Sequence, residues 1–183
     1  MKNIYSNIFK FNKNILSKTL KYLKKSNIVG LPTETVYGLA GNAYSKKAVK
    51  KIYSLKKRPK INPLIIHYYD LKNLLNDIEI NKDFLKLYKN LCPGPITFVM
   101  KKKTSSKICS IATAKLDTVA VRFPNNKKTR AILNELNFPL AIPSANKSTG
   151  VSPVSAFDVA EEFKNKIKII IDDGNSKIGI EST

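Results

Sequence analysis

The chain has 183 residues, of which 43% are apolar and 25% charged, and this composition excludes disordered, collagen-like and repeat proteins. Its 33 basic and 13 acidic residues give a formal net charge of +20, which predicts a polyanionic partner. No stretch has the roughly 18 uninterrupted apolar residues that span a membrane, and the lysine-rich N-terminus lacks the apolar segment of a signal peptide, so we expect a cytoplasmic protein without membrane contact.

Apolar residues at helical spacing predict a helix over residues 12–26, which leads into a short buried strand over 27–31. Ser45 is a predicted cap of a second helix, which ends at the cluster before Pro59. The later predicted elements are strands at 63–69, 96–100, 119–123, 139–142 and 167–171, and helices at 84–91, 126–136 and 155–163. This alternation predicts an α/β sheet in a single domain over residues 1–183, without linkers or repeats.

Most of the positive charge lies in the first third of the chain. Residues 1–60 contain 15 lysines or arginines against the single acid Glu34. Lysine is abundant throughout, so a compositional bias of the genome is an alternative source of this charge. Because lysine is the default cation here, the three arginines, Arg58, Arg122 and Arg130, indicate positions that need a planar guanidinium, although Arg130 lies in a predicted helix and fits a surface role.

A polar loop with a specific sequence follows the first buried strand. It reads Pro-Thr-Glu-Thr-Val-Tyr-Gly-Leu over residues 32–39. Ligands of open α/β sheets bind outside the carboxyl ends of the strands, so this loop is a candidate binding segment. A capped turn whose hydroxyls only satisfy local backbone groups is the alternative.

Two further segments contain groups that bind phosphate or sugar. Arg58 can donate two hydrogen bonds to a phosphate, Asn62 lies in a loop fixed by proline, and His67 is the only histidine in the chain. Ser144 and Asn146 offer a hydroxyl and an amide after the strand at 139–142. A structural histidine and ordinary turn-forming residues are the alternatives.

No pattern predicts covalent or metal-hydroxide catalysis. The chain has no Gly-x-Ser-x-Gly elbow, no Gly-rich nucleotide loop and no His, Cys and Asp cluster at metal spacing, so we predict no metal site and no side chain that acts as a general acid or base. Cys92 and Cys109 are predicted to be reduced thiols. Cations and hydroxyls around a cleft favour nucleotidyl transfer by positioning and charge neutralisation.

Six stretches together resemble the YrdC-like threonylcarbamoyl-AMP synthases, also called TsaC-like, which act in tRNA modification. They are PTETVYGLAG at 32–41, LKKRPKINPLIIH at 55–67, CPGPITFV at 92–99, VAVRFP at 119–124, PSANKSTGVSP at 143–153 and GIEST at 179–183. The resemblance covers nearly the whole chain. The motif sequences are nearer those of the longer members of the family, which have an extra C-terminal domain. The occurrence of all six stretches in this order makes the resemblance to this family specific.

The resemblance implies a twisted α/β sheet of mixed parallel and antiparallel strands, with flanking helices and a concave basic groove. It also implies an L-threonylcarbamoyladenylate synthase that uses L-threonine, bicarbonate and ATP, with Mg²⁺ as the cofactor. A carbamate formed on the threonine amine attacks the α-phosphate, which yields threonylcarbamoyl-AMP and pyrophosphate. A downstream threonylcarbamoyl transferase complex then passes the group to tRNA.

The same resemblance implies roles for individual residues. The expected contacts to L-threonine are Thr35, His67, Arg122, Ile142 and Ser182. The expected contacts to ATP are Lys56, Arg58, Asn62, Thr118, Ser144, Asn146 and Ser152. Arg122 is expected to bind the threonine carboxylate, and Arg58 to offset charge on the departing pyrophosphate, so both act by positioning.

The chain stops at Thr183, where relatives continue into a further strand and an Arg-Pro-Gly-like segment whose arginine contacts ATP. The resemblance therefore implies that this chain lacks that strand segment and any C-terminal domain, and a truncated inactive relative is one alternative. The high charge favours a second alternative, a non-catalytic module that binds double-stranded RNA or tRNA. A carbamoyl-transfer accessory domain is a third, although the zinc-finger-like cysteines of such proteins are missing.

Overall fold

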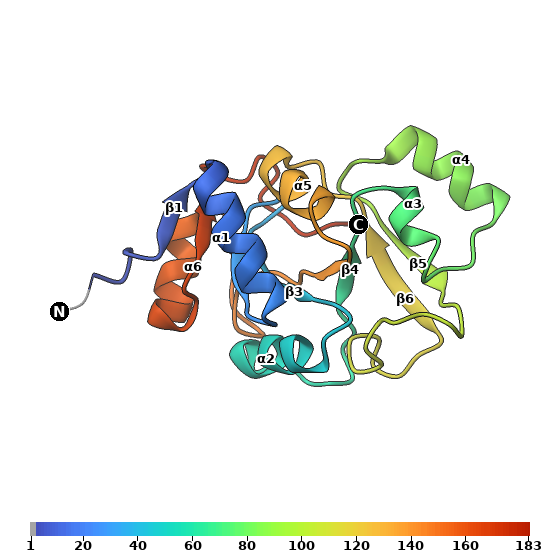
Figure 1. The fold of residues 1–183 in the computed structure, drawn as a ribbon, viewed down its shortest axis with the longest axis horizontal. Coiled ribbons are helices and arrows are strands. Elements are labelled where there is room, and N and C mark those ends of the chain that lie inside the picture. Colours follow the sequence, from blue (N-terminus) through green and yellow to red (C-terminus); the bar gives the residue numbers. More distant parts are fainter. Residues whose placement is uncertain (1–2) are drawn as a thin grey trace.

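A mixed sheet of eight strands forms the centre of the molecule, in a computed structural model that describes residues 3–183 (Figure 1). The strands are β1 (Ile8–Lys10), β2 (Val29–Leu31), β3 (Gly38–Asn42), β4 (Ile65–His67), β5 (Thr97–Lys101), β6 (Thr118–Arg122), β7 (Leu140–Ala141) and β8 (Ile170–Asp172). The helices are α1 (Lys13–Lys24), α2 (Lys46–Lys56), α3 (Leu71–Leu74), α4 (Lys82–Leu91), α5 (Lys127–Asn134) and α6 (Ala156–Phe163), with a 3-10 turn, η1 (Lys164–Lys166), after α6.

The strands lie in the order β1-β8-β2-β3-β7-β4-β6-β5. The pairs β1–β8, β8–β2 and β4–β6 are parallel, whereas β2–β3, β3–β7, β7–β4 and β6–β5 are antiparallel. This arrangement confirms the predicted α/β fold with a mixed sheet. The concave basic groove stays a prediction.

Side chains cap the helices at the predicted starts of α1, α2 and α6, whereas α4 begins two residues before its predicted start at residue 84. Asn12, Ser45 and Asn81 precede α1, α2 and α4, and each accepts a hydrogen bond from a backbone N–H of the first turn. Ser155 and Asp158 form a reciprocal capping box at the start of α6. These local bonds satisfy N–H groups that have no partner inside the helix, which explains why the helix starts follow from sequence.

The sequence pattern does not predict β1, β3 or α3. The β3 sequence Gly-Leu-Ala-Gly-Asn has low strand propensity, and it forms a strand because β2 and β7 pair with it on both sides. α3 is a single turn that begins after Asp70, whose carboxylate accepts a hydrogen bond from the Asn73 N–H. No helix within residues 3–183 is long and apolar enough to cross a membrane.

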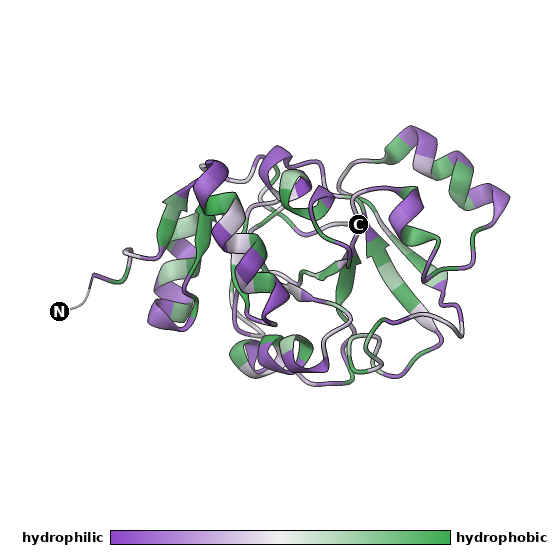
Figure 2. Cartoon of the chain, viewed as in Figure 1, coloured by the Kyte–Doolittle hydropathy of each residue, from purple (hydrophilic) through white to green (hydrophobic). Residues whose placement is uncertain are grey.

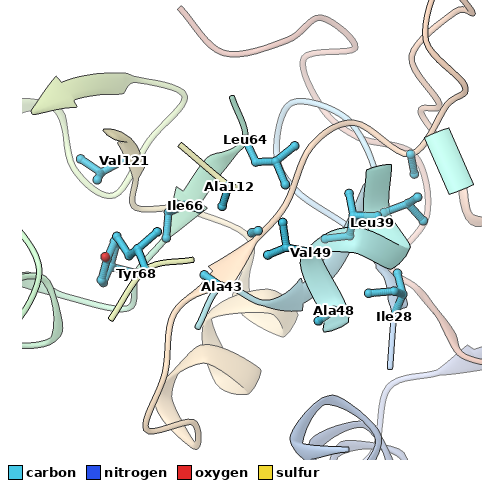
Figure 3. Packing of buried hydrophobic residues seen from close by; sticks show 14 of the residues in the cluster. Ile28, Leu39, Ala43, Ala48, Val49, Leu64, Ile66, Tyr68, Ala112 and Val121 are labelled. Carbon is cyan, nitrogen blue, oxygen red and sulfur yellow. The ribbon is translucent and has the colours of Figure 1, made fainter. Parts of the chain in front are cut away.

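Two clusters of buried apolar residues cover the two faces of the sheet. Alternate residues of a strand point to opposite faces, and accordingly Leu39 and Ala141 belong to one cluster, whereas Ala40 and Leu140 belong to the other. The first cluster includes residues of α2, α3, α4 and α6, and Figure 3 shows part of it around Val49. The second cluster includes residues of α1 and α5. α1 and α2 each contain both hydrophilic and hydrophobic residues, as expected of helices that cover a sheet (Figure 2).

Helices α1 and α5 cover only part of the sheet face against which they pack. Among the described residues, the buried members of their cluster come from β2, β3, β7 and β8 and from segments beside them, and none comes from β4, β5 or β6. On these three strands one set of alternate residues is buried with α3 and α4, whereas Ile65 and Ala120 are half-buried and Val99 is 71% exposed. We call the second set of alternate residues on β4, β5 and β6 the open face.

A buried carboxylate fastens the segment after β5 to the rest of the molecule. Asp77 is fully buried, and it accepts hydrogen bonds from the hydroxyls of Tyr44 at 2.7 Å, Tyr68 at 2.9 Å and Ser106 at 2.7 Å. The Lys107 N–H donates a fourth bond at 3.2 Å. Four donors replace the water that this carboxylate loses on burial.

Candidate functional site

Segments that are distant in the sequence meet at one pocket on the sheet. The atom-free space is about 290 Å³ when space open to solvent is included, and the cavity itself is about 20 Å³. The lining residues are Thr33, Thr35, Val36, Tyr37, Gly38, Ile65, His67, Arg122, Ile142, Ser144, Glu181 and Ser182. All five residues that were predicted to contact L-threonine therefore line a single pocket, together with Ser144 from the predicted ATP contacts.

The strand register explains why these side chains converge. His67 pairs with Arg122 in the parallel ladder of β4 and β6, and Arg122 pairs with Thr97 of β5. Because cross-strand partners point to the same face, all three lie on the open face at the same level of the sheet. The pocket therefore forms where the helix layer ends.

Arg122 is bound to an acid that the predicted site did not include. Its guanidinium donates a hydrogen bond of 2.6 Å to a Glu34 carboxylate oxygen, and both side chains are largely buried. The other carboxylate oxygen of Glu34 accepts a bond from the Asn125 N–H at 3.0 Å. The Arg122 Nε is buried and has no hydrogen-bond partner among residues 3–183. Glu34 thus holds the guanidinium, and the Nε–H is left without a hydrogen-bond partner.

His67 is buried beside Arg122, with 1% of its surface exposed. Its Nδ1 lies 3.3 Å from the Ile65 carbonyl oxygen, and its Nε2 is buried without a partner among the described residues. Burial, with a smaller contribution from the positive charge of Arg122, lowers the pKa of His67 well below its usual value of about 6.5. With a proton on Nδ1 facing the carbonyl, the neutral ring presents Nε2 as a hydrogen-bond acceptor.

Two threonine hydroxyls form a chain at the pocket wall. The Thr33 hydroxyl donates to the Val36 carbonyl oxygen at 2.6 Å, and its oxygen lies 2.8 Å from the Thr35 hydroxyl. Since the Thr33 proton is already used, the Thr35 hydroxyl donates to Thr33. The remaining lone pairs of Thr35 are then available to a donor in the pocket.

Gly38 allows the pocket wall to pack closely. It is bridged to Ser144, and a Cβ at this position would lie 2.2 Å from the Ile142 Cγ2. We therefore expect Gly38→Ala to lower the free energy of unfolding by about 3 kcal/mol, as overpacking of a tight core does. Urea denaturation measures the loss. As a control, Gly174→Ala adds a Cβ that meets no atom within 4 Å, although its positive φ of 70° adds strain of about 1 kcal/mol. Equal losses in the two variants would contradict the close packing at Gly38.

Lys56, a predicted contact to ATP, is buried and bonded to the protein. The side chain is 1% exposed, and its ammonium donates at 2.6 Å to each of the Ser144 and Asn146 carbonyl oxygens and at 3.3 Å to the Asn146 side-chain oxygen. Burial, followed by the charge of Arg58, lowers the pKa of Lys56 to about 8. With all three protons engaged, Lys56 holds the loop after β7 in place. Asn146 is likewise buried, and its amide donates to the Gly150 carbonyl oxygen.

The remaining predicted ATP contacts lie outside the pocket. Arg58 donates to the carbonyl oxygens of Asn62 at 3.2 Å and Pro63 at 3.1 Å, just before β4. Thr118 begins β6 on the open face, four residues before Arg122, which places it about 13 Å away along the strand. Arg58 and Thr118 thus lie toward the amino ends of β4 and β6, and the pocket lies at their carboxyl ends.

The last residues of the chain form one wall of the pocket. The N–H groups of Ile178 and Gly179 donate to the carbonyl oxygens of Glu34 and Thr35. Farther along, Thr183 exchanges backbone bonds with Pro95 and Thr97, and the Ser182 and Thr97 hydroxyl oxygens are 2.7 Å apart. Ser152, a predicted ATP contact, donates a bond of 2.8 Å to the Glu181 carboxylate. This segment therefore crosses from the loop after β2 to the start of β5.

A family model described as "Telomere recombination", for Sua5, YciO and YrdC proteins, matches residues 21–183. The chain belongs to the Sua5/YciO/YrdC family. It is 44% identical to the threonylcarbamoyl-AMP synthase of Pyrococcus abyssi, over 88% of this chain and 47% of that protein. It is 39% identical to the threonylcarbamoyl-AMP synthase of Bacillus subtilis, over 92% of this chain and 49% of that protein. The chain thus spans about half the length of these two relatives.

A solved structure of P. abyssi Sua5 complexed with L-threonine has the same fold as this Sua5/YciO/YrdC chain. The TM-score is 0.88 at 40% sequence identity, and the match covers 96% of this chain and 52% of the other. The match confirms the resemblance that the six sequence stretches indicate.

Sequence reasoning did not predict Glu34 and Glu181 as site residues of this Sua5/YciO/YrdC chain. Glu34 lies inside the first candidate loop, and it is the single acid in residues 1–60, which is a signal that could have identified it. Glu181 lies inside the last matching stretch. Their placement depends on partners 88 and 29 residues away, Arg122 and Ser152, so no local pattern indicates it.

The low pKa of His67 predicts a specific dependence of stability on pH. Below pH 6.5 the unfolded chain binds a proton at this histidine, whereas the folded chain does not, so the stability that the neutral ring contributes is lost as the pH falls toward the folded pKa. We expect the unfolding free energy of the wild type, relative to His67→Gln, to fall by up to about 1.4 kcal/mol per pH unit in this window. Urea denaturation between pH 5 and 7.5 tests this, and a constant difference would contradict it.

Proposed function

We propose that this chain is the catalytic domain of an L-threonylcarbamoyladenylate synthase. In the proposed reaction L-threonine, bicarbonate and ATP give threonylcarbamoyl-AMP, pyrophosphate and water. The main support is the pocket that joins Arg122, His67 and Thr35, in a chain that is 40% identical to a protein whose structure contains L-threonine. The two sequence relatives named threonylcarbamoyl-AMP synthase agree with this assignment.

The pocket offers complementary groups to a zwitterionic amino acid. The unpartnered Nε–H of Arg122 is a donor for the carboxylate, and the unpartnered Nε2 of His67 is an acceptor for an N–H or O–H group. Buried groups without partners cost free energy until a ligand satisfies them. Binding of L-threonine therefore recovers hydrogen bonds that the free pocket leaves unmade.

In this proposal the enzyme accelerates the reaction mainly by positioning the reactants. A carbamate is unstable in water, so the site must hold it near the α-phosphate until the carbamate oxygen attacks and pyrophosphate leaves. Arg58 is fixed by two backbone carbonyl oxygens near the start of β4, and its charge offsets that of the departing pyrophosphate. Ser144 and Ser152 are hydroxyls on the loop that Lys56 holds, which suits them to phosphate contacts.

Mg²⁺ enters the proposal as the partner of ATP. Magnesium sites that use nucleotide phosphates need only one or two protein carboxylates. Glu181 lines the pocket, accepts a bond from Ser152 and forms no ion pair among the described residues, so its carboxylate fits this role. The metal would neutralise phosphate charge.

ATP–pyrophosphate exchange tests the proposed reaction. We expect incorporation of labelled pyrophosphate into ATP only when L-threonine and bicarbonate are both present. Omission of either reactant is the control, because the adenylate forms only from the carbamate. Exchange that is indifferent to both compounds, or no exchange at all with ATP bound, would contradict the proposal.

A non-catalytic module that binds tRNA or double-stranded RNA is the second candidate. In the first candidate, by contrast, a downstream threonylcarbamoyl transferase complex in the cytoplasm passes the group to tRNA. The charge of +20 favours the non-catalytic module, and neither α1 nor α2 contains an acid. Filter binding of tRNA over a salt series tests it. Binding that weakens steeply with salt, without ATP turnover, would favour the module over the enzyme, and no binding at low salt would exclude it.

A further inference from the structure

We propose that Glu34 is a built-in counter-ion that prevents Arg122 from binding simple anions and so keeps the pocket available to the amino acid. It is a positioning residue, because it acts through Arg122 and not on the substrate. The inference rests on the proposed function, in which L-threonine shares the site with three anions, namely bicarbonate, ATP and pyrophosphate. A selective amino acid site must exclude these anions from the guanidinium that it uses for the carboxylate.

The charge of the chain makes unspecific binding of anions a strong competitor. A formal net charge of +20 concentrates anions of every kind near the surface. Arg122 is 4% exposed, and a buried guanidinium without a counter-ion is costly, so it binds whichever small anion reaches it. His67, its partner in the ladder, adds no second charge, since burial holds its pKa well below the usual range. Among the described residues that line the pocket, Arg122 is therefore the one permanent cation to be neutralised.

Contacts from three segments hold the Glu34 carboxylate beside this cation. Arg122 donates to one carboxylate oxygen at 2.6 Å, and the side chains of Arg122 and Glu34 are 5% and 10% exposed. The Asn125 N–H donates to the other oxygen at 3.0 Å, and the Ile178 N–H donates to the Glu34 carbonyl oxygen, also at 3.0 Å. Glu181, the second acid that lines the pocket, is bonded elsewhere. Glu34 is thus a fixed counter-ion rather than a mobile surface charge.

Neutralisation changes what the pocket selects. The Nε–H of Arg122 has no partner among residues 3–183, so the paired guanidinium still offers a directed donor while its net charge is offset. His67 adds the unpartnered Nε2, and Thr35 adds the lone pairs of its hydroxyl. An anion without donors uses only the Arg122 donor, whereas an amino acid also donates N–H or O–H groups to the other two. Selectivity then comes from several matched hydrogen bonds rather than from charge.

Acetate is the probe, since it has the carboxylate of an amino acid without the amine and the side chain. In Glu34→Gln the side chain keeps its size but loses its charge. We expect this variant to bind L-threonine about tenfold more weakly in sodium acetate than in the sodium salt of a bulky sulfonate at equal ionic strength, because acetate occupies Arg122. The wild type should change by less than about twofold. Calorimetric titration of the full chain measures both affinities.

The melting temperature gives a second readout that requires no L-threonine. An anion that binds only the folded chain stabilises it. Acetate should therefore raise the melting temperature of Glu34→Gln by about 4 °C relative to the sulfonate salt and leave that of the wild type unchanged. A merely structural role of Glu34 would lower the melting temperature of the variant in both salts alike.

Two further variants separate charge from local structure. Asp173→Asn is the matched control, because it makes the same change in charge on an exposed acid that accepts a bond of 2.9 Å from the Asn126 amide. It should respond to acetate as the wild type does. Glu34→Asp keeps the charge on a side chain that is one methylene shorter. It should stay insensitive to acetate while binding L-threonine about fivefold more weakly, because the guanidinium is held less firmly.

Three results would overturn the counter-ion role. The first is sensitivity to acetate in the wild type, Asp173→Asn or Glu34→Asp, which would assign anion binding to the overall charge or to local geometry. The second is a loss of L-threonine affinity in Glu34→Gln that is equal in both salts. The third is a Glu34→Gln chain that is unfolded in both salts, since acetate is expected to replace the missing carboxylate.

A wild type that binds no L-threonine would overturn the proposed function without deciding the role of Glu34. The melting temperatures then decide it. Stabilisation of Glu34→Gln by acetate, with none of the wild type, supports the counter-ion role. No stabilisation of Glu34→Gln overturns it.

Discussion

Replacing Arg122 with lysine is expected to weaken the binding of L-threonine about 100-fold, because one charged hydrogen bond and the fork geometry are lost. Lysine keeps the positive charge next to Glu34, but it cannot contact Glu34 and also present the donor that Nε offers in a fixed plane. Calorimetric titration with L-threonine measures the affinity, and the unfolding free energy of the variant shows whether the pocket is intact.

Arg130→Lys is the control for this substitution. The Arg130 guanidinium donates to the Tyr69 and Pro124 carbonyl oxygens and lies 4.5 Å from the centre of the Tyr69 ring, so it is engaged away from the pocket. Its replacement should leave the affinity for L-threonine unchanged. If both lysine variants bind L-threonine as the wild type does, Arg122 only maintains the ion pair with Glu34 and does not contact the amino acid.

Removal of the Asp77 carboxylate is expected to cause the largest loss of stability. Asp77→Ala leaves the buried hydroxyl of Tyr68 and the part-buried hydroxyl of Tyr44 without acceptors, and it also releases Ser106 and the Lys107 N–H. Burial and the nearby carboxylate raise the pKa of both tyrosines, so the hydroxyls stay protonated and need an acceptor. We expect the free energy of unfolding to fall by about 4 kcal/mol.

Urea denaturation of three variants tests the role of Asp77. Tyr44→Phe removes one donor and leaves the carboxylate with three, so it should cost only about 1 kcal/mol. Asp83→Ala removes an exposed acid from the first turn of α4, and its loss should stay below about 1 kcal/mol. A loss for Asp77→Ala as small as that of Asp83→Ala would show that the four hydrogen bonds contribute little to stability.

Local signals in the sequence account for much of the fold. The helices after Asn12 and Ser45 are predictable because their caps and apolar spacing lie within a few residues. β3 is not, because a Gly-rich segment becomes a strand only through the partners on either side of it. Propensity describes single segments, whereas pairing depends on contacts between distant parts of the chain.

In the candidate site, too, residues within local motifs could be predicted, whereas contacts between distant residues could not. Thr35, His67 and Arg122 could be named from motifs that resemble a family, and the structure brings them together. The bond between Glu34 and Arg122 could not be predicted, because it joins residues 88 positions apart whose strands are placed by register. The burial of Lys56 could not be predicted either, since sequence shows a lysine in a basic cluster but not that its ammonium is buried against three oxygens.

Neighbouring residues of β6 point to opposite faces of the sheet and are under different constraints. Val119 and Val121 are packed into the core, whereas Thr118 and Ala120 face away from it and are half-buried. Substitutions at the outward positions can alter what the protein recognises at small thermodynamic cost, while those at the inward positions are constrained by packing. The open face is therefore where new binding specificities can evolve while the fold stays the same.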